Sequence, residues 1–416
     1  MQQHAFFTEP VIVFGILFII LALIFKTSAS NSPFFKRLYK FLPPLILCYF
    51  IPSLLVNFNI ISDLDGNLYY VASRFLLPAC IVLLTLSVDL KSILELGPKV
   101  IIMFLTATLG VIIGGPIALI IIIKFFPNII PEIGLDSLWR GMSTIAGTWI
   151  GGGANQTAMR EVFEVPDAIF SIMVTVDILT AGIWIAVMLW IAGNAKKVDE
   201  FLKADTSALD DLKEKLEHFQ QENQKIPTSI NLITICGIAF GIVAVSYYLG
   251  MLIIPEISKH APELKHLGLT SQFFWTIILS TTFSLILSFK KKVRQLESYG
   301  ASKLGTVFLY ILIATIGMSM ELRAIFENFT LFLIGFIWMS VHAIILFGMA
   351  KAIKAPSFYA CVGSTANIGG AASAPVIASA FHPSLAPVGV LLAMFGYALG
   401  TYGAWLCGQI MRLITL

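Results

Sequence analysis

Charged residues are scarce in this sequence. Lys, Arg, Asp and Glu together make up 12% of its 416 residues, whereas soluble domains carry about 25%. Hydrophobic residues account for 57%, and the mean hydropathy is +0.88. Water cannot be the main solvent of such a chain, and a formal net charge of +3 is too small to indicate a nucleic-acid partner. The composition therefore predicts a protein embedded in the lipid bilayer.

Cysteine is also rare, and the signatures of several enzyme classes are missing. The sequence contains no His-Glu-x-x-His zinc signature, no Gly-x-Ser-x-Gly nucleophile motif and no Walker loop. Five cysteines lie singly in apolar segments, without the spacing of a metal site or a disulfide framework: Cys48, Cys80, Cys236, Cys361 and Cys407. We therefore expect neither an enzyme nor a bound cofactor, and a membrane-embedded enzyme is kept only as an alternative.

Long apolar segments dominate the chain instead. A block of about 18 apolar residues with few charges indicates a membrane-spanning helix. Ten such segments are predicted, at residues 10–25, 41–58, 68–87, 100–125, 168–192, 230–254, 273–288, 304–320, 331–350 and 385–407. Lys26 follows the first segment and no Lys or Arg precedes it, which is the wrong charge order for a cleaved signal peptide. The pattern predicts an all-α polytopic membrane protein that retains this first helix.

One long polar stretch divides these segments into two sets. Leu209, Leu212, Leu216 and Phe219 follow one another at helical spacing among the many charges of residues 196–225. This pattern predicts an exposed, amphipathic linker helix that is solvated rather than bound to a partner. The domain division expected from it is a first transmembrane repeat at 1–195, a cytoplasmic linker at 196–227 and a second transmembrane repeat at 228–416.

Two further segments, residues 139–163 and 357–381, are rich in glycine and in polar residues. Glycine in a helix interior costs about 1 kcal/mol relative to alanine. Each segment is therefore predicted to break at its glycines into two half-helices. The alternative is that the glycines serve only close helix packing, but this does not explain why polar residues cluster at both breaks.

The same succession of features occurs in both sets. Residues 87–93 (SVDLKSI) resemble 319–325 (SMELRAI), and 150–152 (IGG) resemble 368–370 (IGG). Internal repeats of this kind are typical of secondary transporters. If each broken segment is a re-entrant hairpin, every half has five crossings, and the two repeats must be inverted.

The distribution of basic residues tests this topology. With hairpins, 19 of the 27 Lys and Arg residues fall on the cytoplasmic side, and if both segments cross the membrane only about 10 do. The positive-inside rule therefore favours hairpins, the first entering from outside and the second from the cytoplasm. We expect both termini outside, the linker inside, and a multi-pass location in the cytoplasmic (inner) membrane.

Three motifs carry a resemblance to a known family: 150–155 (IGGGAN), 366–371 (ANIGGA) and 396–402 (GYALGTY). At these motifs the chain resembles the YjcL-like family of uncharacterised integral membrane proteins over nearly its whole length. More distantly, it is similar to the glutamate:sodium symporters and the 2-hydroxycarboxylate symporters. That resemblance implies inverted five-helix repeats with Gly-rich re-entrant loops, a homodimer, coupling to sodium or protons, an elevator-like movement and carboxylate-bearing substrates. The glutamate symporters have a His inside their first Gly-Gly motif, where this chain has Gly153 and Ala154, so the identity of the substrate is not carried over.

The two glycine breaks are the predicted solute pathway, because broken backbone within the hydrocarbon is tolerated only where it is buried in protein or lines a wet cavity. Glycine lets the backbone approach a solute closely, and the free N–H groups of the following half-helix suit a carboxylate. Ser373 is expected to cap the second half-helix, with Pro375 in its first turn. The predicted substrate-binding residues are Gly151, Gly152, Gly153, Asn155, Gln156, Thr365, Asn367, Gly369, Gly370 and Ser373.

Asp177 is the predicted cation ligand. It lies near the middle of an apolar segment, where an ionisable side chain costs about 2.5 to 3.5 kcal/mol unless it meets a partner, an ion or water. Thr180 lies on the same helix face one turn later, and Trp184 a further turn on. We expect a sodium site formed by Asp177 with Thr180, Thr148 and Ser364.

Alternatives remain for the buried ionisable groups. Asp177 could instead be a structural partner for Arg140 or Arg160, since charges in membranes also pair. His342 lies within the ninth predicted span, where a hydrogen-bonded interhelical contact is favoured over a proton relay.

Taken as a whole, the pattern predicts a secondary active transporter, a sodium-coupled symporter of a small anionic metabolite such as an amino acid, a dipeptide or an organic acid. A proton-coupled transporter or a channel-like facilitator is the alternative. The expected partners are the solute, the bilayer and a second copy of the chain in a homodimer.

Overall fold

The computed structural model describes residues 5–41, 44–62, 67–130, 134–206, 226–261, 269–320, 329–382 and 385–416. Within these ranges the regular elements are helices, and one isolated β-bridge joins Phe7 to Ile61. Seven of the helices are long and apolar enough to cross a membrane, and a bent pair over residues 272–299 raises the number to as many as eight. The prediction of an all-helical polytopic membrane protein is confirmed.

Three of the ten predicted spans form short helices. These are α3 (Pro44–Asn57), α13 (Gln272–Ser288) and α15 (Ala301–Gly317), with 14, 17 and 17 residues. A straight spanning helix needs about 20 residues. After α13 the chain bends by 106° into the segment Lys291–Tyr299. A count of ten crossings therefore stays a prediction.

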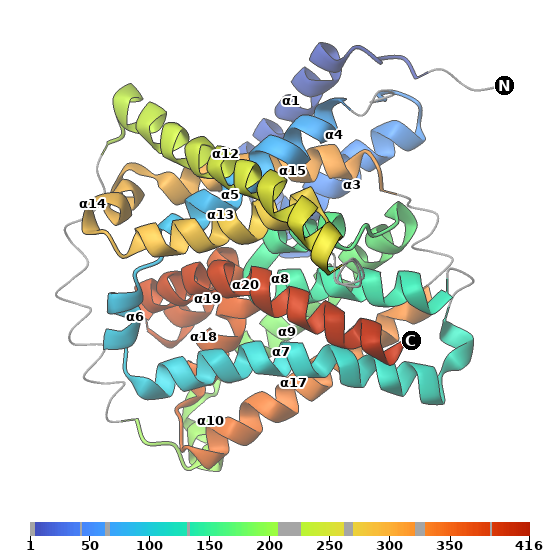
Figure 1. Cartoon of the computed structure of the whole chain (residues 1–416). Coiled ribbons are helices and arrows are strands. Elements are labelled where there is room, and N and C mark those ends of the chain that lie inside the picture. The colour runs from blue at the N-terminus through green and yellow to red at the C-terminus, as the bar shows by residue number, and fades with distance from the viewer. Residues whose placement is uncertain are drawn as a thin grey trace.

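The helices form two layers, seen as the upper and lower halves of Figure 1. The first layer contains α1 (Pro10–Ser28), α3, α4 (Asn67–Val71), α5 (Leu77–Leu86), α12 (Ser229–His260), α13 and α15. The second layer contains α7 (Pro98–Phe125), α8 (Gly134–Val162), α9 (Asp167–Gly193), α17 (Phe332–Ala352), α18 (Ser357–Asn367), α19 (Gly370–Phe381) and α20 (Ala386–Ile414). Each layer thus combines helices from both halves of the chain, so the packing does not follow the division at the linker.

Local chemistry sets several helix boundaries. Proline occupies the first turn of α1, α7 and α20, where its missing N–H would have no partner in any case. Thr228 and Asn231 form a capping box at the start of α12, and Ser271 caps α13. The shorter connecting helices are α2 (Pro33–Phe41), α6 (Leu90–Glu95), α10 (Ala195–Leu202) and α14 (Lys291–Arg294).

The first glycine-rich segment folds back on itself. Gly151 and Gly152 have non-helical backbone angles within α8, and Gly152 has a φ of +72°. The rings of Trp139 and Phe163, at opposite ends of the segment, lie 5.3 Å apart. A straight helix rises about 1.5 Å per residue, which would place those ends more than 30 Å apart. α8 is therefore a helical hairpin with its tip at the two glycines.

The second glycine-rich segment is also a hairpin. α18 and α19 are separated by Ile368 and Gly369, and Gly369 has a φ of +102°. The rings of Phe358 and Phe381, near the outer ends of the two helices, lie 5.4 Å apart. The predicted break at the glycines is confirmed in both segments, and in both the chain reverses direction there.

The two hairpins enter the bundle from opposite ends. The open end of α18 and α19 lies beside α10, because the Ser357 N–H donates to Asp199 Oδ1 at 2.7 Å. α7 starts at this same end, where Lys99 pairs with Asp205 at 3.0 Å, and runs to the far end, from which α8 begins. In Figure 1 the α8 hairpin opens on the right, where α1 starts and α20 ends, and the α18–α19 hairpin opens on the left.

Parts of two predicted features fall outside the described residues. α10 covers the beginning of the predicted linker helix, but Leu209, Leu212, Leu216 and Phe219 lie beyond the described ranges, as do residues 321–325 of the repeat motif. The linker helix and the domain division at 195 and 227 stay predictions.

Candidate functional site

The tips of the two hairpins meet on α20. A Cβ atom on Gly396 would lie 2.9 Å from the Ile150 carbonyl oxygen and 3.2 Å from that of Ala366, the carbonyls just before the two breaks. The adjacent Tyr397 ring contacts the same tips, because a Cβ on Gly152 would lie 3.2 Å from its Cε1 and one on Gly370 3.8 Å from its hydroxyl oxygen. Only a residue without a side chain at 396 allows both backbones to approach this closely.

Two asparagines hold the tips in matching ways. Asn155 accepts a hydrogen bond from the Thr401 hydroxyl at 2.6 Å and donates to the Tyr397 carbonyl, four residues earlier on α20, at 3.1 Å. Its amide also donates to the Gly151 carbonyl four residues back in its own helix. The first tip is therefore bound to the last helix of the chain.

Asn367 repeats this pattern on α7. It accepts from the Thr108 hydroxyl at 2.9 Å and donates to the Phe104 carbonyl, again four residues earlier, at 3.3 Å. Its amide also donates to the Gly363 carbonyl. Both predicted asparagines thus serve to position the tips, and in each the amide nitrogen donates to two backbone carbonyls.

The remaining predicted substrate residues surround the tips in different settings. Gly151 is packed against Gly400, while Gly369 is exposed. Thr365 is buried and donates to the Cys361 carbonyl of its own helix at 2.8 Å. At the tips the predicted residues therefore present chiefly backbone groups, and their side chains hold this backbone in position by hydrogen bonds.

The expectation for Ser373 and Pro375 is wrong. α19 begins at Gly370, its N-cap is Gly369, and no side chain caps it. The positive φ angles of Gly369 and Gly370 turn the chain within two residues, so the helix starts earlier than expected. Ser373 lies in its first turn, close to Gly369, and Pro375 lies inside the helix.

Asp177 lies beside the first hairpin and is surrounded by neutral donors. Trp149 Nε1 donates to Oδ1 at 2.6 Å and Gln156 Nε2 to Oδ2 at 3.3 Å, one donor from each arm of α8. The Thr148 side chain also lies near the carboxyl group. The side chain is buried, with 6% of the residue surface exposed. Asp177 therefore bridges the two arms next to the tip.

Neither arginine pairs with Asp177. Arg140 binds Asp136 at 2.8 Å, and Arg160 forms an ion pair with Asp167. The alternative of a structural pair between Asp177 and either of these two residues is wrong. A carboxyl group held only by neutral donors retains unused lone pairs for a cation.

The other predicted cation ligands lie elsewhere on α9 and its neighbours. Ser364 Oγ accepts from Trp184 Nε1 at 2.9 Å and lies 2.9 Å from His342 Nε2. Thr180 Oγ1 is buried against Gly335 of α17 and has no hydrogen-bond partner among the described residues. Thr148 and Asp177 are thus in contact, whereas Ser364 belongs to an interhelical contact with His342 and Trp184.

Comparison with known proteins places this arrangement in a family. The family model described as "Protein of unknown function (DUF819)" matches residues 15–414. The chain belongs to this family. It is also 24% identical over 357 residues to the "Uncharacterized membrane protein YjcL" of Bacillus subtilis, covering 82% of this chain and 83% of that protein. The resemblance to the YjcL-like family is confirmed.

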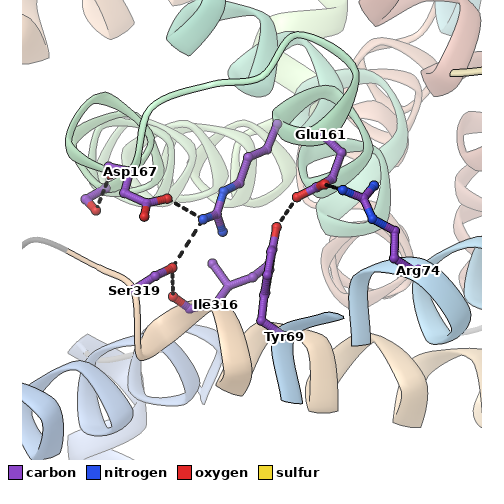
Figure 2. A network of polar contacts seen from close by, with 8 residues as sticks. Tyr69, Arg74, Glu161, Asp167, Ile316 and Ser319 are labelled. Carbon is purple, nitrogen blue, oxygen red and sulfur yellow. Dashed lines mark hydrogen bonds and ion pairs between the residues drawn. The ribbon is translucent and has the colours of Figure 1, made fainter. Parts of the chain in front are cut away.

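In this family member a second polar network joins the two layers (Figure 2). Arg74, on a π-helical turn between α4 and α5, pairs with Glu161 at 2.9 Å, and the Tyr69 hydroxyl donates to the same carboxylate. Arg160 donates to Asp167 and to the Ser319 hydroxyl, which follows α15. The second arm of the α8 hairpin is therefore fixed at its open end to the first layer.

Several of these residues have no signal in the sequence. Thr108 lies in a segment that reads as a plain apolar span, and its partner Asn367 is 259 residues away. Trp149 looks like an ordinary core aromatic until Asp177 is placed beside it. Tyr397 and Thr401 belong to the motif at residues 396–402, in which nothing indicates a contact with the hairpin tips. Those contacts depend on the tertiary fold.

Proposed function

We propose that the chain is a secondary active transporter of a small carboxylate-bearing metabolite, coupled to sodium. The observation that carries this proposal is the meeting of two broken hairpins, entering from opposite ends, on one helix at Gly396 and Tyr397. Broken backbone at membrane depth is tolerated where it is buried in protein or lines a wet path. Half-helix termini at the midplane are the means by which many transporters bind a solute and its coupling ion.

The opposite entry of the hairpins supports two inverted repeats with five crossings each. In that arrangement α3, α13 and α15 complete the ten crossings, with local thinning of the bilayer around these short helices. The linker end, with α6, α10 and α14, then lies in the cytoplasm, and the hairpin layer is the part that moves against the first layer. The protein is proposed to form a homodimer in the cytoplasmic (inner) membrane.

Asp177 is the proposed cation site. A buried carboxylate without a cationic partner is costly, because burying a charge requires compensation. The contact of Asp177 with Trp149, Gln156 and Thr148 links it to both arms of the first hairpin. A sodium ion bound there would neutralise the charge and stabilise the position of the tip. The first hairpin, α8, would then couple the binding of the ion to the binding of the solute.

Uptake into proteoliposomes tests the proposal. Purified full-length protein is reconstituted and offered radiolabelled glutamate, succinate, citrate and alanyl-alanine, with an inward sodium gradient and no pH gradient. We expect saturable accumulation of at least one of these, abolished when choline replaces sodium. Equal accumulation in sodium and choline would remove sodium coupling, and non-saturating flux that needs no gradient would favour a channel.

A further inference from the structure

Arg160 has an unused hydrogen-bonding edge in a buried position. Its side chain is 7% exposed, and Nη2 donates to Asp167 and to the Ser319 hydroxyl, the latter at 3.2 Å. Nη1 is buried and has no hydrogen-bond partner among the described residues. A guanidinium has five N–H donors in a rigid, planar fork, and leaving a buried donor unpaired is destabilising. From the sequence, Arg160 is predicted only as an alternative partner for Asp177.

Two aromatic rings lie against the same guanidinium. Its Cζ lies 4.9 Å from the centroid of the Tyr69 ring and 4.7 Å from that of Phe170. Cation–π contacts of this kind restrict the orientation of the guanidinium. Asp167 and Ser319 occupy Nη2. The N–H groups of Nη1 therefore remain available to an oxygen acceptor, such as one oxygen of a carboxylate.

A polar side chain on the same arm of α8 as Arg160 is linked to Asp177. Gln156 lies one helical turn before Arg160 on the second arm of α8, and its amide joins the Tyr49 hydroxyl, at 3.5 Å, to Asp177. Tyr49, Gln156 and Asp177 thus form one chain of polar side chains, and this chain lies one helical turn from Arg160.

Among the described residues, the groups around Arg160 leave one charge, that of Asp177, without a counter-ion, and one guanidinium nitrogen, Nη1, without an acceptor. Arg74 is paired with Glu161, and Arg160 is paired with Asp167 on one edge. A carboxylate on Nη1 and a cation at Asp177 enter as a neutral pair. Burying the two together is less costly than burying either alone, since an uncompensated charge is heavily penalised in a membrane.

We propose that the Nη1 edge of Arg160, with the Tyr49 hydroxyl, binds a carboxylate group of the transported solute. This inference rests on the proposed function and adds a side-chain anion site to it. Since Ser319 and Tyr69 come from the first layer and Arg160 from the second, the solute binds where the layers meet. Binding of the carboxylate and of sodium is reciprocally favourable, because sodium compensates Asp177 and so lowers the repulsion that an entering carboxylate meets.

The test uses thermal-shift titration of the purified full-length protein with succinate, L-glutamate, citrate and L-alanyl-L-alanine, each beside its carboxamide, with and without sodium. The key variant is Arg160→Lys, which keeps the charge and the pairing with Asp167 but loses the planar fork. The matched control is Arg140→Lys, on the other arm of the hairpin, whose partners are Asp136 and the Phe163 carbonyl.

We expect a carboxylate, but not its carboxamide, to raise the melting temperature of the wild type, and more so with sodium. Arg160→Lys should raise the half-saturating concentration by about ten-fold or more, and Arg140→Lys by less than about two-fold. If Arg160→Lys does not fold, Tyr49→Phe answers the same question by deleting one hydroxyl, with a several-fold increase expected.

Three outcomes overturn the inference. A wild-type response in Arg160→Lys and Tyr49→Phe with sodium-dependent uptake intact removes Arg160 from solute binding and leaves the proposed function standing. A large loss of melting temperature with an unchanged half-saturating concentration makes Arg160 a purely structural link. Absence of any carboxylate response in the wild type, together with absence of uptake, removes both the anion site and the proposed function.

Discussion

The Thr401 hydroxyl and Asn155 Oδ1, 246 residues apart in the chain, are joined by a hydrogen bond of 2.6 Å. This contact holds the first hairpin tip against α20, and Thr108 does the same for the second tip through Asn367. In both bonds a threonine hydroxyl donates to an asparagine side-chain oxygen. Deleting one hydroxyl at a time therefore measures how much each bond stabilises its own tip.

The first prediction concerns these hydroxyls. Thr401→Val and Thr108→Val should each lower stability by about 0.6 to 1.7 kcal/mol, the range for interhelical hydrogen bonds in membranes. Thermal unfolding of the purified variants measures the loss. Asn155→Ala and Asn367→Ala complete two double-mutant cycles. Additive losses within either cycle would show that the hydroxyl and the amide do not interact there.

The second prediction concerns Gly396. Gly396→Ala places a methyl group against two carbonyl oxygens, so it should lower stability by about 1 to 3 kcal/mol, as overpacking does, and reduce uptake strongly. Gly182→Ala in α9 is the matched control, because a Cβ there meets nothing within 4 Å. That variant should be neutral or up to about 1 kcal/mol more stable. Equal melting temperatures for the two would contradict the close approach of the tips to α20.

The third prediction concerns Asp177. Asp177→Asn keeps the volume and the contacts with Trp149 and Thr148, and no arginine is left unpaired by it. We therefore expect the melting temperature to change little, while transport falls and its sodium dependence flattens. Asp136→Asn at the exposed end of the hairpin is the control. Normal uptake by Asp177→Asn with an unchanged sodium midpoint would exclude Asp177 from the coupling site.

The fourth prediction concerns sidedness. In a variant lacking the native cysteines, Asn128→Cys, at the open end of the α8 hairpin, should react with an impermeant maleimide in intact cells. Glu200→Cys, on α10 at the opposite end, should react only after permeabilisation. Both positions are exposed at the protein surface, so accessibility within the protein does not differ. Ready labelling of Glu200→Cys in intact cells would reverse the proposed topology.

Part of this structure is predictable from the sequence because it depends on local backbone chemistry. The glycines at 151–153 and 369–370 disfavour a regular helix, and both breaks occur at them. The burial of Asp177 follows from the apolar segment around it. The cap expected at Ser373 failed because positive φ angles at Gly369 and Gly370 start the helix earlier, and one sequence does not reveal those angles.

The rest of the site depends on contacts between distant segments. Trp149 and Gln156 meet Asp177 only because α8 folds back, which brings both arms against α9. The pairing of Asn367 with Thr108 and of Asn155 with Thr401 requires α7 and α20 to lie across the hairpins. Periodicity and composition identify the helices but contain no information on which helix faces which tip.

The mixing of both chain halves within each layer also has a consequence for biosynthesis. When α8 and α9 have been made, the partners of Asn155 are still missing, because Tyr397 and Thr401 lie on α20, which is synthesised much later. Until α20 is in place, the Asn155 side chain keeps its bond to the Gly151 carbonyl but lacks its partners on α20. Because unsatisfied polar groups are costly in the bilayer, truncation before α20 should lower the yield of folded protein.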